Sequence, residues 1–119
     1  MTLGEKIDEL SKDIQETIVE DDNAIEYYPL PEKIKQLAEC FNVSDVKNND
    51  FINWVKATPM HNIKECIRLC NEKIPKNTPN LRYKEQSIKQ IKYLANNAIW
   101  WFKKGCKDLN IDILDNKVE

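Results

Sequence analysis

Cations and aromatic residues alternate along residues 82–101, a pattern that could bind an anionic ligand. Arg82, Lys84 and Lys89 lie within the first three turns of one expected helix, with Tyr83 between the first two. The start of a helix favours anions, and Arg and Lys bind phosphate oxygens. Aromatic rings such as Tyr93 can stack on nucleobases. The pattern predicts a phosphorylated nucleotide as ligand, although the solvated cations of an ordinary helix would look the same.

Enzymatic chemistry fits the sequence less well. His61 is the only histidine, so there is no convincing set of general bases. Glu5 and Asp8 have the spacing of a magnesium-binding carboxylate pair, but no second helix repeats it. Two isolated glycines cannot make a glycine-rich phosphate loop. We therefore expect no enzyme, and neither a catalytic residue nor a metal or cofactor.

The four cysteines are expected to be core thiols. No apolar run is long enough for a membrane span, and residues 1–10 lack the pattern of a signal peptide, so we expect a cytoplasmic protein without membrane contact. Disulfides are rare in that compartment, where free Cys behaves as a small buried hydrophobe. The alternative is a zinc site made by His61, Cys66, Cys70 and one more thiol.

Charge is strongly segregated along the chain. Residues 1–50 carry five Lys against thirteen Asp and Glu, whereas residues 51–107 carry twelve Lys and Arg against three Glu. An acidic and a basic half of this kind indicate an anionic partner for the basic half, or an oligomer held together by the two halves.

Five amphipathic segments must position these residues, so the expected fold is all-α, a small bundle of about five helices in a single domain, residues 1–119. Two observations support the all-α prediction: the chain has just two glycines, and its apolar residues recur every three or four positions. Residues 1–22 form an acidic amphipathic helix that opens with a capping box from Thr2 to Glu5. Pro31, Asp50 and Pro59 are expected at the starts of the next three helices.

The last two helices are predicted to form a long C-terminal helical hairpin over residues 59–105. A glycine after cations is a common helix end, so the second helix should stop at Gly105. Leu94, Ile99 and Trp101 widen its apolar surface beyond what one partner helix covers. We therefore expect a homo-oligomer with Trp101 or its neighbours at the interface.

The segment Pro79-Asn80-Leu81-Arg82-Tyr83-Lys84, continued by an apolar and Ala pattern to Lys104, resembles part of a known family. It is similar to the second helix of the helical-hairpin domain shared by phage anti-Thoeris and anti-CBASS sponge proteins. The resemblance covers about a quarter of the chain. It departs from the family at Lys89, where a Thr is expected, and at Asn97, where a large apolar residue is expected.

The resemblance implies a phage-type anti-defence function without catalysis. Family members sequester a cyclic nucleotide or cyclic ADP-ribose-type immune signal in the host cell, as oligomers. By this match Arg82 would contact a phosphate and Lys104 would be the terminal cation. The predicted ligand-binding residues are thus Arg82, Tyr83, Lys84, Lys89 and Lys104.

Two other functions remain open from the sequence. A protein-binding inhibitor, similar to an anti-CRISPR, could use the acidic helix of residues 1–22 to imitate nucleic acid and bind a host defence protein. Residues 34–44 resemble the first half of a helix-turn-helix, but residues 45–50 supply one Lys against two Asp, which is poor for approaching DNA.

Overall fold

The computed structural model describes residues 1–17, 29–73 and 81–118, with the side chains of all of these except residues 29, 73 and 81–84. The described residues form helices and one isolated β-bridge, between Thr2 and Lys117, with no strand. The helices are α1 (Leu3–Glu16), α2 (Pro29–Cys40), α3 (Asn49–Ala57), α4 (Pro59–Lys73) and α5 (Leu81–Asp108), followed by the short 3-10 helix η1 (Ile113–Asp115). The all-α prediction is confirmed.

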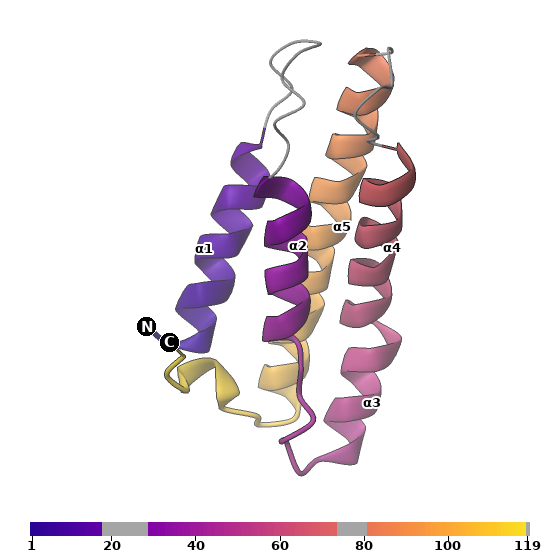
Figure 1. Ribbon diagram of the computed structural model, residues 1–119. Coiled ribbons are helices and arrows are strands. Elements are labelled where there is room, and N and C mark those ends of the chain that lie inside the picture. Colours follow the sequence, from indigo (N-terminus) through magenta and orange to yellow (C-terminus); the bar gives the residue numbers. More distant parts are fainter. Residues whose placement is uncertain (18–28, 74–80, 119) are drawn as a thin grey trace.

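The helices stand side by side as four columns that run alternately up and down (Figure 1). Only Thr58 separates α3 from α4, so these two helices make one column. Around the bundle, α1 packs on α2, α2 on α4, α4 on α5, and α5 back on α1. The 28-residue α5 is the longest of the described helices and runs the length of the bundle.

The core lies between the four columns and comes from the apolar stripe of each helix. Phe102 of α5 is stacked on Phe41, which follows α2, with ring centroids 4.4 Å apart, and lies 5.8 Å from Phe51 of α3. These rings join three columns at the end of the bundle where α3 begins. On α5 the buried stripe consists of Ile88, Ile91, Ala95, Ala98, Ile99, Phe102 and Cys106.

The predicted capping box of α1 is confirmed. The Glu5 amide donates to Thr2 Oγ1 at 3.1 Å, and the Thr2 amide donates to Glu5 Oε1 at 2.9 Å. The helix ends earlier than predicted, because Thr17 has an extended backbone and its hydroxyl donates to the carbonyl oxygen of Asp13 at 3.1 Å. The rest of the predicted segment, residues 18–22, lies outside the described residues.

Two further helix starts differ from those predicted. The helix α2 begins at Pro29 instead of Pro31. At the start of α3, Asn48 Oδ1 accepts the amide hydrogen of Phe51 at 3.1 Å, so Asn48 is the cap and Asp50 lies in the first turn. Asn and Asp cap equally well, and only the backbone conformation decides between neighbours. Pro59 begins α4 as predicted.

The prediction that α5 stops at Gly105 is wrong, because this glycine is needed for packing. A Cβ at this position would lie 2.5 Å from Cδ1 of Trp54, and α5 continues to Asp108. The left-handed residue is Asn110, with φ 54°. Its amide donates to the carbonyl of Lys107, and the amide of Ile111 donates to that of Cys106 at 2.8 Å. These two bonds form a Schellman motif.

The C-terminal segment returns to the start of α1, so the two chain ends lie together (Figure 1). The Leu3 amide donates to the carbonyl of Asn116 at 2.7 Å, and the Val118 amide donates to that of Met1 at 2.9 Å. A Cβ on Gly4 would lie 3.2 Å from the carbonyl oxygen of Leu114. Both glycines of this chain thus serve close contacts between segments.

Candidate functional site

The outer face of α5 carries a largely exposed stripe opposite its buried stripe. We call this stripe, consisting of Lys89, Tyr93, Asn97, Trp100 and Lys104, the outer stripe of α5. The spacings of three and four residues place its members on one side of the helix. Tyr93 is 66% exposed and Trp100 is 55% exposed. They are the two large aromatic side chains that the described surface exposes most, so this stripe is the leading candidate site.

Neighbouring residues hold the ring of Trp100 in place. It meets the ring of Trp101 edge to face, with centroids 4.6 Å apart and an interplanar angle of 84°. Lys104 Nζ lies 5.8 Å from the centroid of the Trp100 ring and 3.2 Å from Oδ2 of Asp108. An exposed aromatic ring thus lies beside an ammonium group, an arrangement that suits an aromatic ligand with a negative charge.

Lys89 is exposed near the other end of the stripe. No carboxylate oxygen of the described side chains lies within 4.0 Å of its ammonium, in contrast to Lys104. Lys89 and Lys104 are 15 residues apart, so their backbones are separated by about 22 Å along the helix. One chain therefore cannot bring these two predicted ligand contacts to the same phosphate.

The remaining predicted site residues lie at the start of α5 and beside Trp54. Arg82, Tyr83 and Lys84 lie in the first turn of α5, and their side chains are outside the described part, so their role stays a prediction. Trp101 is half-buried against Trp54 of α3. The centroids of the two rings are 5.6 Å apart, and the backbone carbonyl of Trp101 accepts a hydrogen bond from the Trp54 indole N–H at 3.0 Å. It therefore faces a neighbour within the molecule.

Sequence reasoning named Tyr93 as a ring that could stack on a nucleobase, but it did not place Tyr93 and Trp100 together on one exposed face of the helix. The spacing could have shown this. Tyr93 and Trp100 are seven residues apart, which puts them on one side of a helix, and the buried Ile91, Ala95 and Ala98 lie on the opposite side.

Some of the segregated charge is paired within the molecule. On α1, Asp8 accepts a hydrogen bond from Lys103 of α5 at 2.5 Å, and Asp13 pairs with Lys33 of α2 at 2.9 Å. Gln15 of α1 also donates to the backbone carbonyl of Lys92 at 3.0 Å. These contacts fix the acidic helix against α5 and α2, and they occupy two of its carboxylates.

The charge of Arg68 on α4 is neutralised in a similar way. Arg68 forms ion pairs with Glu65 and Glu72 of its own helix, the second at 2.6 Å. The hydrogen bonds from Arg68 lower the pKa of the Glu65 carboxyl, and both carboxylates raise the pKa of the guanidinium. An exposed arginine held between two carboxylates has little positive charge left for an anionic ligand.

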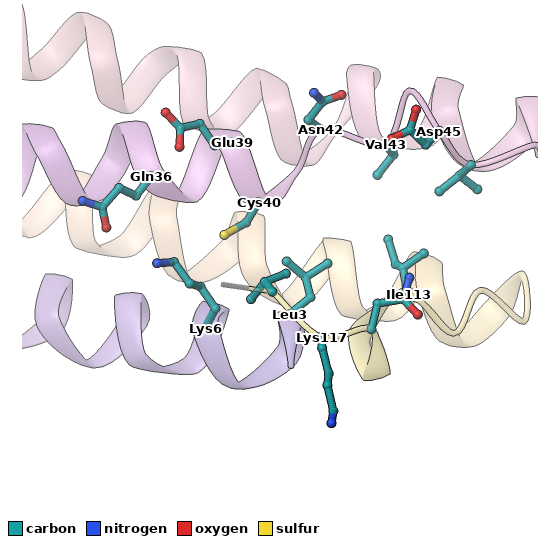
Figure 2. Close-up of a pocket in the computed structure, with 13 residues that line it drawn as sticks. Leu3, Lys6, Gln36, Glu39, Cys40, Asn42, Val43, Asp45, Ile113 and Lys117 are labelled. Atoms are coloured by element: carbon teal, nitrogen blue, oxygen red, sulfur yellow. The ribbon is translucent and has the colours of Figure 1, made fainter. Parts of the chain in front are cut away.

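A half-open pocket of about 400 Å³ lies at the end of the bundle where the chain ends meet. Its lining comes from the start of α1, the end of α2, residues 42–46 and the C-terminal segment. Figure 2 shows Lys6 and Cys40 in the space between α1 and α2, with Glu39 and Asn42 pointing away from it. Burial raises the pKa of the Cys40 thiol, so at neutral pH this thiol is a protonated and poor nucleophile.

The other three cysteines are core thiols, as predicted. Burial raises the pKa of Cys66 to about 12 and those of Cys70 and Cys106 to about 11. Cys66 Sγ also lies 3.6 Å from the carbonyl oxygen of Ile91. His61 is exposed, and the described residues contain no group of three His, Cys, Asp or Glu side chains that could hold a metal ion, so they do not assemble the alternative zinc site.

Comparison with known proteins found no family model, curated protein or solved structure that matches the chain. The resemblance of residues 79–104 to the sponge family therefore stays a prediction. None of the helices in the described ranges is long and apolar enough to cross a membrane.

Proposed function

We propose that this chain is a non-enzymatic binding protein that sequesters a cyclic nucleotide or a cyclic ADP-ribose-type signal at the outer stripe of α5. The observation that supports it most is the exposed pair Tyr93 and Trp100, flanked on the same helix face by Lys89 and Lys104. On this proposal the protein is an anti-defence protein of phage type that acts in the host cytoplasm as a homo-oligomer. The long hairpin of α4 and α5 is its binding module.

The physical argument combines stacking with charge. An aromatic side chain that stacks on a nucleobase contributes about 1–3 kcal/mol, and it does so with little dependence on the base. Lys89 is an exposed ammonium without a carboxylate close by among the described side chains, so phosphate binding displaces no existing ion pair there. Both features favour binding without hydrolysis, because neither supplies a general base.

The runner-up is a protein-binding inhibitor that uses α1. Its exposed face keeps Glu9 and Glu16, but Lys12 lies between them, and Asp8 and Asp13 are already paired. A surface that imitates nucleic acid needs a dense row of free negative charges. We therefore rank this function second.

A heat-denaturation screen tests the proposal. Cyclic dinucleotides, cyclic trinucleotides and cyclic ADP-ribose isomers are added one at a time, and a ligand at 100 times its Kd should stabilise the protein by about 2.7 kcal/mol. Trp100→Ala and Lys89→Ala should each weaken binding about tenfold or more, because each removes a stacking or charged contact. Lys64→Ala is the matched control, an exposed lysine on α4.

The two functions predict opposite results for a second pair of variants. If the ligand binds α5, the charge reversal Glu9→Lys with Glu16→Lys leaves nucleotide binding unchanged. If the protein inhibits a defence protein through α1, this reversal abolishes inhibition, whereas Trp100→Ala has no effect. Absence of stabilisation by every nucleotide, together with loss of inhibition on reversal of α1, would overturn the proposal.

A further inference from the structure

The outer stripe of α5, taken together with the neighbouring Asn96, has nearly the same residue types when it is read from either end. Three pairs are equidistant from the midpoint between Asn96 and Asn97: these two asparagines, then Tyr93 with Trp100, then Lys89 with Lys104. All six side chains are exposed except Asn97, which is half-buried. A two-fold axis at this midpoint would place each residue opposite its equidistant counterpart on a second copy, so aromatic side chains would meet aromatic side chains twice.

We propose that two copies of this chain pack α5 against α5, antiparallel, about a two-fold axis at Asn96 and Asn97, and that the anion site is complete only in this dimer. Tyr93 of each copy then lies opposite the partner's Trp100. Aromatic pairs in such positions contact edge to face or offset-stacked, and they would cover the two most exposed aromatic rings of the described surface. The anion site rests on the function proposed above; the dimer does not.

Dimerisation would bring Lys89 of one copy close to the partner's Lys104. Within one chain Lys89 and Lys104 are about 22 Å apart along the helix. Across the two-fold axis, Lys89 comes to the same level as the partner's Lys104, beside Tyr93 and the partner's Trp100. Two equivalent sites result, each with two ammonium groups and two aromatic rings, which is the chemistry that binds a phosphate next to a base.

The same geometry makes dimerisation depend on an anion. Without one, Lys89 and the partner's Lys104 repel each other, and Asp108 offsets only part of this charge through its contact with Lys104 at 3.2 Å. The stripe is also small: about 22 Å long and about 10 Å wide, it covers much less than the roughly 800 Å² per partner of a standard stable interface. We therefore expect a weak dimer that a polyvalent phosphate strengthens.

Cysteine cross-linking tests the arrangement without any nucleotide. In a Cys40→Ser background, which removes the one partly exposed native thiol, Asn97→Cys should form a disulfide-linked dimer under mild oxidation. Gln86→Cys is the control, because in the antiparallel dimer its two copies are about 31 Å apart. Cross-linking of Gln86→Cys with itself would indicate parallel helices, and a monomeric Asn97→Cys would indicate no contact here; either result overturns the inference.

A charge reversal tests the anion site. Sedimentation velocity is run with and without inorganic pyrophosphate as the probe, and pyrophosphate should shift the wild-type chain towards twice its mass of 14.0 kDa. Lys89→Glu replaces the repulsion by attraction to the partner's Lys104, so the dimer should form about fivefold more tightly without pyrophosphate and lose its response to it. An unchanged dimer, or a retained response to pyrophosphate, would overturn the shared anion site.

The outcomes separate this inference from the proposed function. A dimer cross-linked at residue 97 that binds no nucleotide would leave the interface standing and remove the proposed function. A chain that binds a nucleotide while it stays monomeric would keep the function and overturn the dimer.

Discussion

Replacing Gly105 by Ala should destabilise the protein, although the same change usually stabilises a helix. Inside a helix, Gly→Ala ordinarily gains about 1 kcal/mol. Here the new Cβ would lie 2.5 Å from Cδ1 and 2.6 Å from Nε1 of Trp54, so the indole ring must move by about 1 Å to reach normal contact. That movement lengthens the hydrogen bond from Nε1 to the carbonyl of Trp101, which is 3.0 Å in the native chain.

The expected magnitude follows from these terms. Forcing a methyl group into a packed site costs about 1–3 kcal/mol, and the lost hydrogen bond costs about 0.5–1.5 kcal/mol. After the helix gain of about 1 kcal/mol is subtracted, Gly105→Ala should lower the free energy of unfolding by about 0.5–3.5 kcal/mol. The melting temperature should fall by roughly 4 °C for each kcal/mol in a chain of this size.

The assay is urea unfolding followed by circular dichroism at 222 nm, in a double-mutant cycle with Trp54→Leu. In the Trp54→Leu background the indole ring is gone, so Gly105→Ala should become neutral or stabilising by up to about 1 kcal/mol. A stabilising effect of Gly105→Ala in the wild-type background, or an equal change in both backgrounds, would refute the role assigned to this contact.

Two further predictions concern the helix end and the thiols. Because Asn110 has φ 54°, Asn110→Ala should destabilise by about 1 kcal/mol and Asn110→Gly should not, as measured by urea unfolding; an equal loss for both would refute the left-handed cap. A thiol reagent at pH 8 should modify Cys40 in the native chain well before the three buried cysteines, which should react only on unfolding; uniform reaction would contradict their burial. Since the pKa of Cys66 is raised from 9.0 to about 12, and those of Cys70 and Cys106 to about 11, the unfolded chain loses these protons first as the pH rises. Their stabilising contribution should therefore be complete below pH 9 and should decline between about pH 9 and 12, which unfolding experiments across that range would detect.

The sequence by itself determined the fold class and most of the helices. Apolar residues at three-four spacing, two glycines and the Thr2–Glu5 box are local signals, and local hydrogen bonds and amphipathic faces are enough to predict a helix. The burial of Cys66, Cys70 and Cys106 also followed from their chemistry and their place in apolar stripes.

Tertiary structure alone decided what the two glycines do and which aromatic residues are exposed. Gly105 has the sequence context of a helix end, yet α5 continues because Trp54, from a helix some fifty residues earlier, packs against its backbone. Trp100 and Trp101 are adjacent and chemically identical, and only the packing of Trp101 against Trp54 of α3 leaves Trp101 half-buried while Trp100 is exposed. A residue's own neighbours in the chain carry no information about contacts of this kind, because those contacts form only when distant helices meet.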